Sequence, residues 1–241
     1  MIRSQLMRVR HHLLTRLSRA VFRPQPIPSL EKLGSAYGGW TVPVDLLSED
    51  SVCYLAGVGE DITFDLALIE RVGCEVYALD PTPRAALHVE THAAAVEKFH
   101  FLPVGLWSEE TVLRFYAPAD ASHVSHSVTN LQGTTDYFEA ACVPLSKLLK
   151  EHGHDHVDLL KMDIEGAEHT VIDWLLQSGV LPRILAVEFD QPTPWRKVRH
   201  SVNRLRDAGY ELVAIDIWDY TFVRPLTGPG LPSRSLIFPL E

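Results

Sequence analysis

The segment at residues 157–169 constrains the fold of this chain most; it reads Val-Asp-Leu-Leu-Lys-Met-Asp-Ile-Glu-Gly-Ala-Glu-His. Its first half is apolar enough for a strand buried in an α/β sheet. Its second half carries four charged side chains, Lys161, Asp163, Glu165 and Glu168. Buried charges are costly unless they are paired or used, and ligands of open α/β sheets bind where strands end. The segment therefore predicts a ligand site between a strand and a helix, with a solvated turn and surface ion pairs as the alternative.

The octapeptide Lys161 to Glu168 resembles the Lys-x-Asp-x-Glu-Gly-x-Glu signature of FkbM-type methyltransferases, and the similarity runs from about Ser51 to Asp190. Those proteins are similar to class I enzymes that use S-adenosylmethionine. The resemblance implies a Rossmann-like α/β fold: a seven-stranded, mostly parallel sheet in the order 3-2-1-4-5-7-6, with an antiparallel last strand and helices on both faces. The last two strands are expected at Tyr210 to Ile217 and Ser235 to Leu240. S-adenosylmethionine is the cofactor that the resemblance implies.

Length and charge bound the organisation of the chain. Its 241 residues suit one α/β domain with small appendages, and we predict a basic amphipathic helix at 1–24, a linker or lid at 25–50 and a methyltransferase domain at 51–241. The formal net charge is −9, although the first 24 residues hold six arginines and no acid. The remainder is therefore more acidic still, which argues against a nucleic-acid partner.

The three cysteines, Cys53, Cys74 and Cys142, form no metal-binding pattern. Buried reduced thiols are expected, and with them a reducing, cytoplasmic compartment. The amphipathic start has three interpretations: packing on its own domain or on the partner in a homodimer, association with an anionic membrane, or an organellar targeting peptide.

The first strand and helix frame a glycine turn, Gly57-Val58-Gly59-Glu60-Asp61. The third glycine of the dinucleotide fingerprint is missing, and a bare Gly-x-Gly is often only a tight turn. Glu60 and Asp61 would repel a phosphate at the start of the helix, so NAD, FAD and ATP are disfavoured. The positively charged S-adenosylmethionine suits this loop, and Gly57, Val58, Gly59 and Glu60 are its predicted contacts.

Further cofactor contacts are predicted after the second and third strands. Asp80 follows the strand at Glu75 to Leu79, where a carboxylate can take both ribose hydroxyls; the alternative is that it starts the turn at Pro81 and caps the next helix. The resemblance places Gly105 and Leu106 beside the adenine, with Trp107 as a second candidate wall. We predict that Pro81 contacts the cofactor with Asp80.

The catalytic candidates are Asp163, Lys161, Glu165 and His126. Methyl transfer from a sulfonium needs no nucleophilic side chain, so the enzyme contributes positioning and a base for the acceptor proton. Asp163 or a histidine of the polar loop at 120–136, His126 or His123, would be that base. Solvent-exposed loop histidines are the alternative for that pair, and Glu168 is expected beside the acceptor.

We predict no metal site. The tract at His152 to His156 has a metal-like composition but sits in a short polar linker. A divalent metal held by Asp163, Glu188 and Asp190 is the remaining option, and Glu188 is otherwise expected to face the acceptor or pair with Lys161.

These observations lead to a methyltransferase dependent on S-adenosylmethionine that methylates a hydroxyl of a sugar, glycan or other small natural-product acceptor. The alternatives are a non-catalytic module that binds the cofactor and an NAD-dependent oxidoreductase on a similar fold. The run from Leu55 to Asp61 departs from the Asp-Gly-Ala-Asn usual in the family and indicates a divergent branch.

Overall fold

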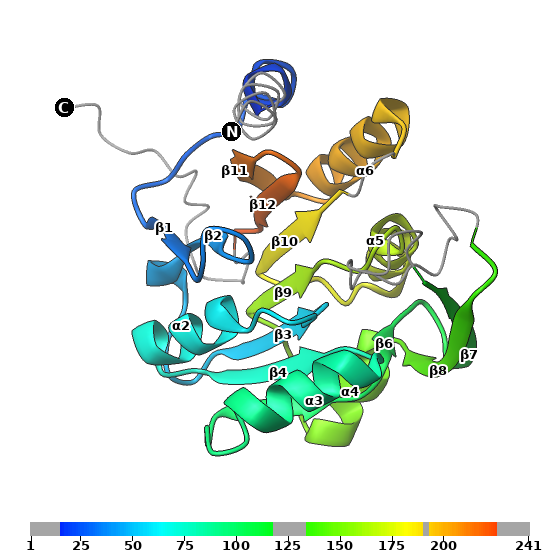
Figure 1. Ribbon diagram of the computed structural model, residues 1–241. Coiled ribbons are helices and arrows are strands. Elements are labelled where there is room, and N and C mark those ends of the chain that lie inside the picture. The colour runs from blue at the N-terminus through cyan, green and yellow to red at the C-terminus, as the bar shows by residue number, and fades with distance from the viewer. Residues whose placement is uncertain (1–14, 118–133, 190–192, 226–241) are drawn as a thin grey trace, which may run out of the picture.

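A computed structural model describes residues 15–117, 134–189 and 193–225 (Figure 1). Its centre is a seven-stranded sheet in the order β5-β4-β3-β9-β10-β12-β11, in which only β12 runs antiparallel to its neighbours. Numbered along the sequence, this order is the predicted 3-2-1-4-5-7-6. The strands are β3 (Val52–Ala56), β4 (Glu75–Leu79), β5 (Phe99–Leu102), β9 (Leu159–Met162), β10 (Ile184–Glu188), β11 (Glu211–Asp216) and β12 (Asp219–Val223).

The antiparallel seventh strand is not where the sequence placed it. It is β12, which forms a tight hairpin with β11. The predicted strand at 235–240 lies outside the described residues. β11 matches the strand predicted at 210–217 to within one residue at each end. The turn residues that follow it, Ile217 and Trp218, are apolar, so the sequence showed no turn signal before β12.

Helices cover both faces of the sheet, as predicted (Figure 1). Side chains alternate along β3: Cys53 and Leu55 pack with α2 and α3, whereas Tyr54 and Ala56 pack with α4, α5 and α6. Two hydrophobic cores result, one on each face, because successive strand residues point to opposite sides. The helices are α2 (Thr63–Val72), α3 (Pro83–His92), α4 (Leu145–His152), α5 (Glu168–Ser178) and α6 (Trp195–Asp207).

A second, three-stranded sheet stands beside the main one. It consists of β6 (Gly105–Leu106), β8 (Tyr137–Val143) and β7 (Thr111–Tyr116), in that order. This small sheet carries β6 to the edge where β3 and β4 end.

The residues before the first strand of the sheet are folded onto it. A helix at 15–22 precedes a hairpin of β1 (Leu30–Leu33) and β2 (Trp40–Pro43) and a 3-10 turn, η1 (Val44–Leu46). Buried side chains of β2 join the core on the α2 face, and the Thr221 hydroxyl donates a hydrogen bond to the Thr41 carbonyl (2.7 Å). Among the described residues, no helix is both long and apolar enough to span a bilayer.

Candidate active site

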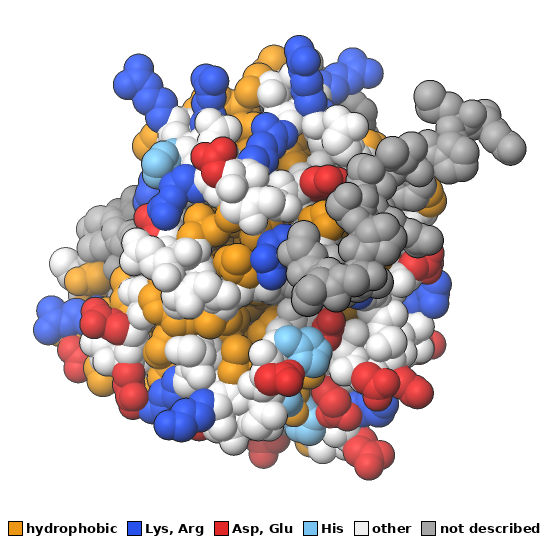
Figure 2. Space-filling view, turned by 180° about the vertical axis from the view of Figure 1, so that it is seen from behind, with side chains coloured by type: hydrophobic (Ala, Val, Ile, Leu, Met, Phe, Trp, Pro, Cys, Tyr) orange, Lys and Arg blue, Asp and Glu red, His pale blue; other side chains and the backbone are white. Residues whose placement is uncertain are grey.

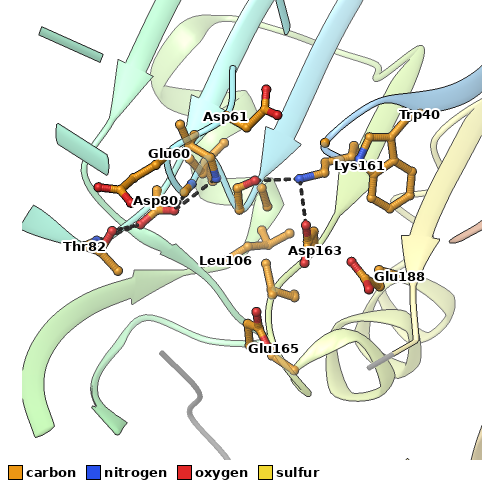
Figure 3. A pocket seen from close by; sticks show the side chains of 18 of the residues that line it. Trp40, Glu60, Asp61, Asp80, Thr82, Leu106, Lys161, Asp163, Glu165 and Glu188 are labelled. Atoms are coloured by element: carbon orange, nitrogen blue, oxygen red, sulfur yellow. Dashed lines mark hydrogen bonds and ion pairs between the residues drawn. The ribbon is translucent and has the colours of Figure 1, made fainter. Parts of the chain in front are cut away.

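A cavity of about 890 Å³ opens at the carboxyl edge of the main sheet (Figure 3). Its walls come from eight places in the chain: the β1–β2 turn, the loop after β3, the turn after β4, β6, β7, the turn after β9, the end of β10, and the β11–β12 turn. All the predicted cofactor contacts line it, as do Lys161, Asp163 and Glu165. Trp107 is not among the described residues that line the cavity. The predicted residues therefore lie together around one cavity, and their roles stay predictions.

The glycine turn after β3 packs closely against the turn that follows β9. Gly57 has φ +87°, and a Cβ placed on it would lie 1.8 Å from the carbonyl oxygen of Asp163. The Gly57 N–H donates to the Leu79 carbonyl at 2.9 Å. Only glycine combines this backbone conformation with this close approach.

Asp80 holds the same turn in place through hydrogen bonds to its backbone. It is 6% exposed; its Oδ2 accepts hydrogen bonds from the backbone N–H groups of Val58 (3.0 Å) and Gly59 (2.9 Å). Its Oδ1 accepts from the N–H and the hydroxyl of Thr82, which caps α3. Asp80 therefore starts the turn at Pro81 as the alternative proposed, but Thr82 and not Asp80 caps α3; ribose binding by Asp80 stays a prediction.

The acidic loop is less negative than the sequence suggested. Glu60 forms an ion pair with Arg84 of α3 at 2.8 Å, and Asp61 accepts hydrogen bonds from Ser35 and Thr63. Arg84 lies in the cavity wall, so a basic residue does reach this loop although none lies within it. Of the described residues that line the cavity, seven are acids and two are bases, so the wall stays acidic.

Lys161 is a buried cation held on three sides. Its Nζ donates to the Gly57 carbonyl at 2.5 Å, lies 3.5 Å from Asp163 Oδ2 and sits 5.3 Å from the centre of the Trp40 ring. Only 6% of the residue is exposed. Lys161 thus links β9 to the glycine turn by a hydrogen bond and places a positive charge beside Asp163.

Carboxyl groups gather at the other end of the cavity, those of Asp163, Glu165 and Glu188 (Figure 3). Asp219 belongs to the same group, because its charge acts on Glu188. Burial, with the nearby charge of Asp163, raises the pKa of Glu188 well above its usual range, and its side chain shares a hydrogen bond with Asp163. Burial and the charge of Asp163 also raise the pKa of Asp219, to about 7. Carboxyl groups packed this closely cannot all ionise, so Glu188 is the one kept protonated.

Glu168 does not face the acceptor side as predicted. It is fully buried, and its Oε1 accepts hydrogen bonds from the backbone N–H groups of Ile164 (3.2 Å) and Gly166 (3.0 Å). Glu165, between them, has φ +53°. Glu168 therefore stabilises the strained turn that presents Asp163 and Glu165, and its role is structural.

The histidines of the tract before β9 are occupied elsewhere. His154 Nδ1 lies 2.9 Å from the Tyr54 hydroxyl, and His156 pairs with Asp155 and Asp158. Among the described residues, no group of three potential ligands could hold a metal ion. His123, His126 and Asp190 lie outside those residues, so their predicted roles are not addressed by the structure.

Sequence reasoning missed several wall residues. Arg84 comes from a helix without a motif, Tyr37 from the β1–β2 turn, and Trp218 and Asp219 from the β11–β12 turn. The only sequence signal for the last two is an aspartate beside an aromatic residue in a short turn. Such a pair is too common in surface hairpins to indicate a site.

With this geometry in place, comparison with known proteins decides the family. The model of the methyltransferase FkbM domain matches residues 56–212. The chain belongs to this family. Membership makes S-adenosylmethionine the cofactor and leaves the oxidoreductase alternative without support. The cavity fits that cofactor: its wall is acidic, which suits a sulfonium and an ammonium group, and a side chain on Gly57 would obstruct the turn.

Relatives of the chain are distant. It is 29% identical over 142 residues to methyltransferase-like protein 24 of Homo sapiens and 27% identical to that of Rattus norvegicus, matching 59% of this chain in each case. The matches cover 32% and 33% of those relatives, so this chain aligns with about a third of their length. Among solved structures, the fibrillarin pre-rRNA processing protein of Methanococcus jannaschii has a TM-score of 0.44 at 14% identity, over 76% of this chain and 69% of that one.

Proposed function

We propose that this protein is an S-adenosylmethionine-dependent methyltransferase that methylates a hydroxyl group of a small neutral acceptor, such as a sugar or glycan. The observation that carries the proposal is the position of Asp163 and Glu188, whose carboxyl groups line the cavity next to the glycine turn (Figure 3). An acceptor hydroxyl must lose a proton during methylation, and a positioned carboxylate is a suitable acceptor for it.

The two ends of the cavity suit the two substrates. The cofactor supplies an electrophilic methyl group when it is bound. Gly57 and Gly59 would allow close approach of the backbone, Asp80 would hold the ribose, and Leu106 would pack against the adenine. These contacts would put the cofactor at the end of the cavity nearest α2 and α3 and would leave the end with the carboxyl groups for the acceptor.

Asp163 is the proposed base. The Lys161 Nζ lies 3.5 Å from its Oδ2, and the raised pKa of Glu188 makes that carboxyl a hydrogen-bond donor for it. Glu188 thereby orients the base without competing for the acceptor proton. Lys161 acts through Asp163 and the glycine turn and is a positioning residue.

The acceptor end favours a neutral polyhydroxyl compound. Carboxyl groups accept hydrogen bonds from hydroxyls, and Glu165 and Asp219 are placed to do so. Tyr37 and Trp218 add aromatic surface to the same wall, which suits the apolar face of a sugar ring. An anionic acceptor would be repelled by this group of acids.

Isothermal titration of the purified protein with S-adenosylmethionine and S-adenosylhomocysteine tests the first half of the proposal. Binding of both is expected; a folded sample that binds neither would refute it. Transfer of a labelled methyl group to a panel of sugars and glycans tests the second half. Cofactor binding without transfer to any acceptor would favour the non-catalytic module.

The base is tested by Asp163→Asn, with Glu188→Gln and the exposed Asp45→Asn as matched variants. Asp163→Asn is expected to lower turnover by roughly 10²- to 10⁴-fold, with cofactor affinity changed far less. Glu188→Gln keeps a donor for Asp163, so a smaller loss is expected, and Asp45→Asn should be neutral. Unchanged turnover in Asp163→Asn would exclude this base.

A further inference from the structure

One end of the molecule is basic although the chain is acidic. The helix at 15–22 and α6 lie next to each other at the end drawn uppermost in Figure 1. The Phe22 and Trp195 rings are in contact, with centroids 4.9 Å apart, and Arg206 donates to the Phe22 carbonyl. In sequence these helices are far apart, so only the fold joins them into one surface.

Basic side chains concentrate on this surface. Residues 15–23 and α6 together hold eight lysines and arginines and a single acid, Asp207. Arg204 is paired with Asp173. Exposed to solvent are Arg16, Arg19, Arg23, Arg196, Lys197, Arg199 and Arg206. Figure 2 shows the lysines and arginines gathered over this end, with hydrophobic side chains between them. The remainder of the chain is correspondingly acidic.

Apolar side chains are exposed at the same end. Leu17 is 60% exposed, Val21 51% and Trp195 40%. Leu17 and Val21 are one helical turn apart and therefore share a face. Aliphatic and aromatic residues beside basic ones are the composition of surfaces that lie on a bilayer, where the rings and chains enter the headgroup region.

This surface borders the cavity. Thr15 accepts a hydrogen bond from the Ile217 N–H at 3.2 Å, and the Arg19 guanidinium donates to the Ile215 carbonyl at 2.7 Å. Ile217 itself lines the cavity. A partner bound to the two helices would therefore lie beside the cavity mouth.

We propose that the surface formed by the helix at 15–22 and α6 binds an anionic membrane. Charge complementarity attracts it to acidic headgroups, and Leu17, Val21 and Trp195 insert at the interface. A nucleic acid fits less well for two reasons. A phosphate backbone would leave the exposed aliphatic side chains in contact with water, and the acidic cavity next to the surface would repel it. The proposal does not depend on methyl transfer.

The test is flotation of the full chain with vesicles of phosphatidylcholine alone and of phosphatidylcholine mixed with phosphatidylserine. Binding to the mixed vesicles only is expected, and it should weaken as salt is raised. The triple variant Arg196→Gln, Lys197→Gln, Arg199→Gln should bind roughly a hundredfold more weakly, since each basic residue near an anionic surface contributes about fivefold. Leu17→Ser with Val21→Ser should also lose binding.

Matched controls lie on other faces. Leu87→Ser on α3 alters a side chain that is 66% exposed, and Lys150→Gln on α4 removes an exposed charge; both should bind vesicles like the wild type. Thermal unfolding of every variant verifies the fold. Three outcomes would overturn the proposal: no vesicle binding, binding of an RNA oligonucleotide in place of vesicles, or a dimer in light scattering that Leu17→Ser with Val21→Ser dissociates without any vesicle binding.

Discussion

The backbone at Gly57 passes so close to the turn after β9 that an added methyl group would collide with it and displace the wall of the cavity. In Gly57→Ala the new Cβ would lie 1.8 Å from the Asp163 carbonyl oxygen at a φ of +87°. Relief requires movement of the turn, and the strain alone is about 1–3 kcal/mol. Urea unfolding should show a loss at least this large, and titration should show loss of cofactor binding.

Gly59→Ala is the matched control for that change. Gly59 also has a positive φ, +57°, but nothing lies within 4 Å of an added Cβ. Only the cost of a left-handed conformation is expected, roughly 1 kcal/mol. Equal effects of the two substitutions on stability would show that the contact with Asp163 is unimportant.

Glu188 gives the stability of the protein a distinctive pH dependence. Its folded pKa lies well above the ordinary value of 4.5 because burial and the charge of Asp163 disfavour its carboxylate. Above the unfolded pKa, the folded state therefore binds more protons than the unfolded state, and this group's contribution to stability falls as pH rises towards the folded pKa.

Glu188→Gln removes that penalty while keeping a neutral donor. The variant and the wild type should be similar in stability near pH 4, and the variant should be more stable near pH 8 by at least about 1 kcal/mol. Chemical unfolding across this range measures the difference. A difference that stays constant with pH would contradict protonation of Glu188 in the folded state.

The cavity residues that belong to a sequence motif could be predicted from the sequence. The cavity residues that lie outside any motif could not. Lys161 and Asp163 were found because charges at the end of an apolar strand need a reason. Glu168 belongs to the same motif, yet it bonds to the backbone of its own turn, and spacing alone cannot distinguish the two uses of a carboxylate. Asp219 and Arg84 have no local pattern, because their role arises when distant elements meet.

The helix at 15–22 is predicted to act as a structural element of the domain. Phe22 is 2% exposed and contacts the rings of Trp195 and Tyr220. Phe22→Ala should lower the free energy of unfolding by about 3–5 kcal/mol. Leu17→Ala, on the exposed face of the same helix, should change it by less than about 0.5 kcal/mol. Similar values for both would mean that this helix is not part of the cooperative unit.

Elements with a strong apolar pattern were located well. The strand at Glu75 to Leu79 was placed to the residue, and the resemblance supplied the strand order, which no local pattern contains. The β1–β2 hairpin was taken for a linker or lid because its strands are only four residues long and β1 is half-exposed. Register and burial of such short strands are set by the sheet that they pack against.

The cavity joins parts of the chain that are distant in sequence, so its ligand should stabilise the molecule as a whole. The β1–β2 turn, the loop after β3, the turn after β9 and the β11–β12 turn all contribute to the wall. The strands next to these segments contribute side chains to both hydrophobic cores. A ligand that binds only the folded state adds about 2.7 kcal/mol at a hundred times its dissociation constant, which corresponds to a rise in Tm of about 5–10 °C for a domain of this size.

S-adenosylmethionine is therefore expected to raise Tm in a concentration-dependent way, whereas NADH at the same concentration should not. The cofactor's positive charge suits the acidic wall, and the same acids would repel a diphosphate. Among the described residues of the wall, two bases, Arg84 and Lys161, offset that repulsion. Differential scanning fluorimetry measures both shifts. Gly57→Ala should abolish the shift while Leu87→Ser retains it, because the first alters the turn that receives the cofactor and the second only an exposed face of α3. A shift with NADH in place of S-adenosylmethionine would reverse the assignment of the cofactor.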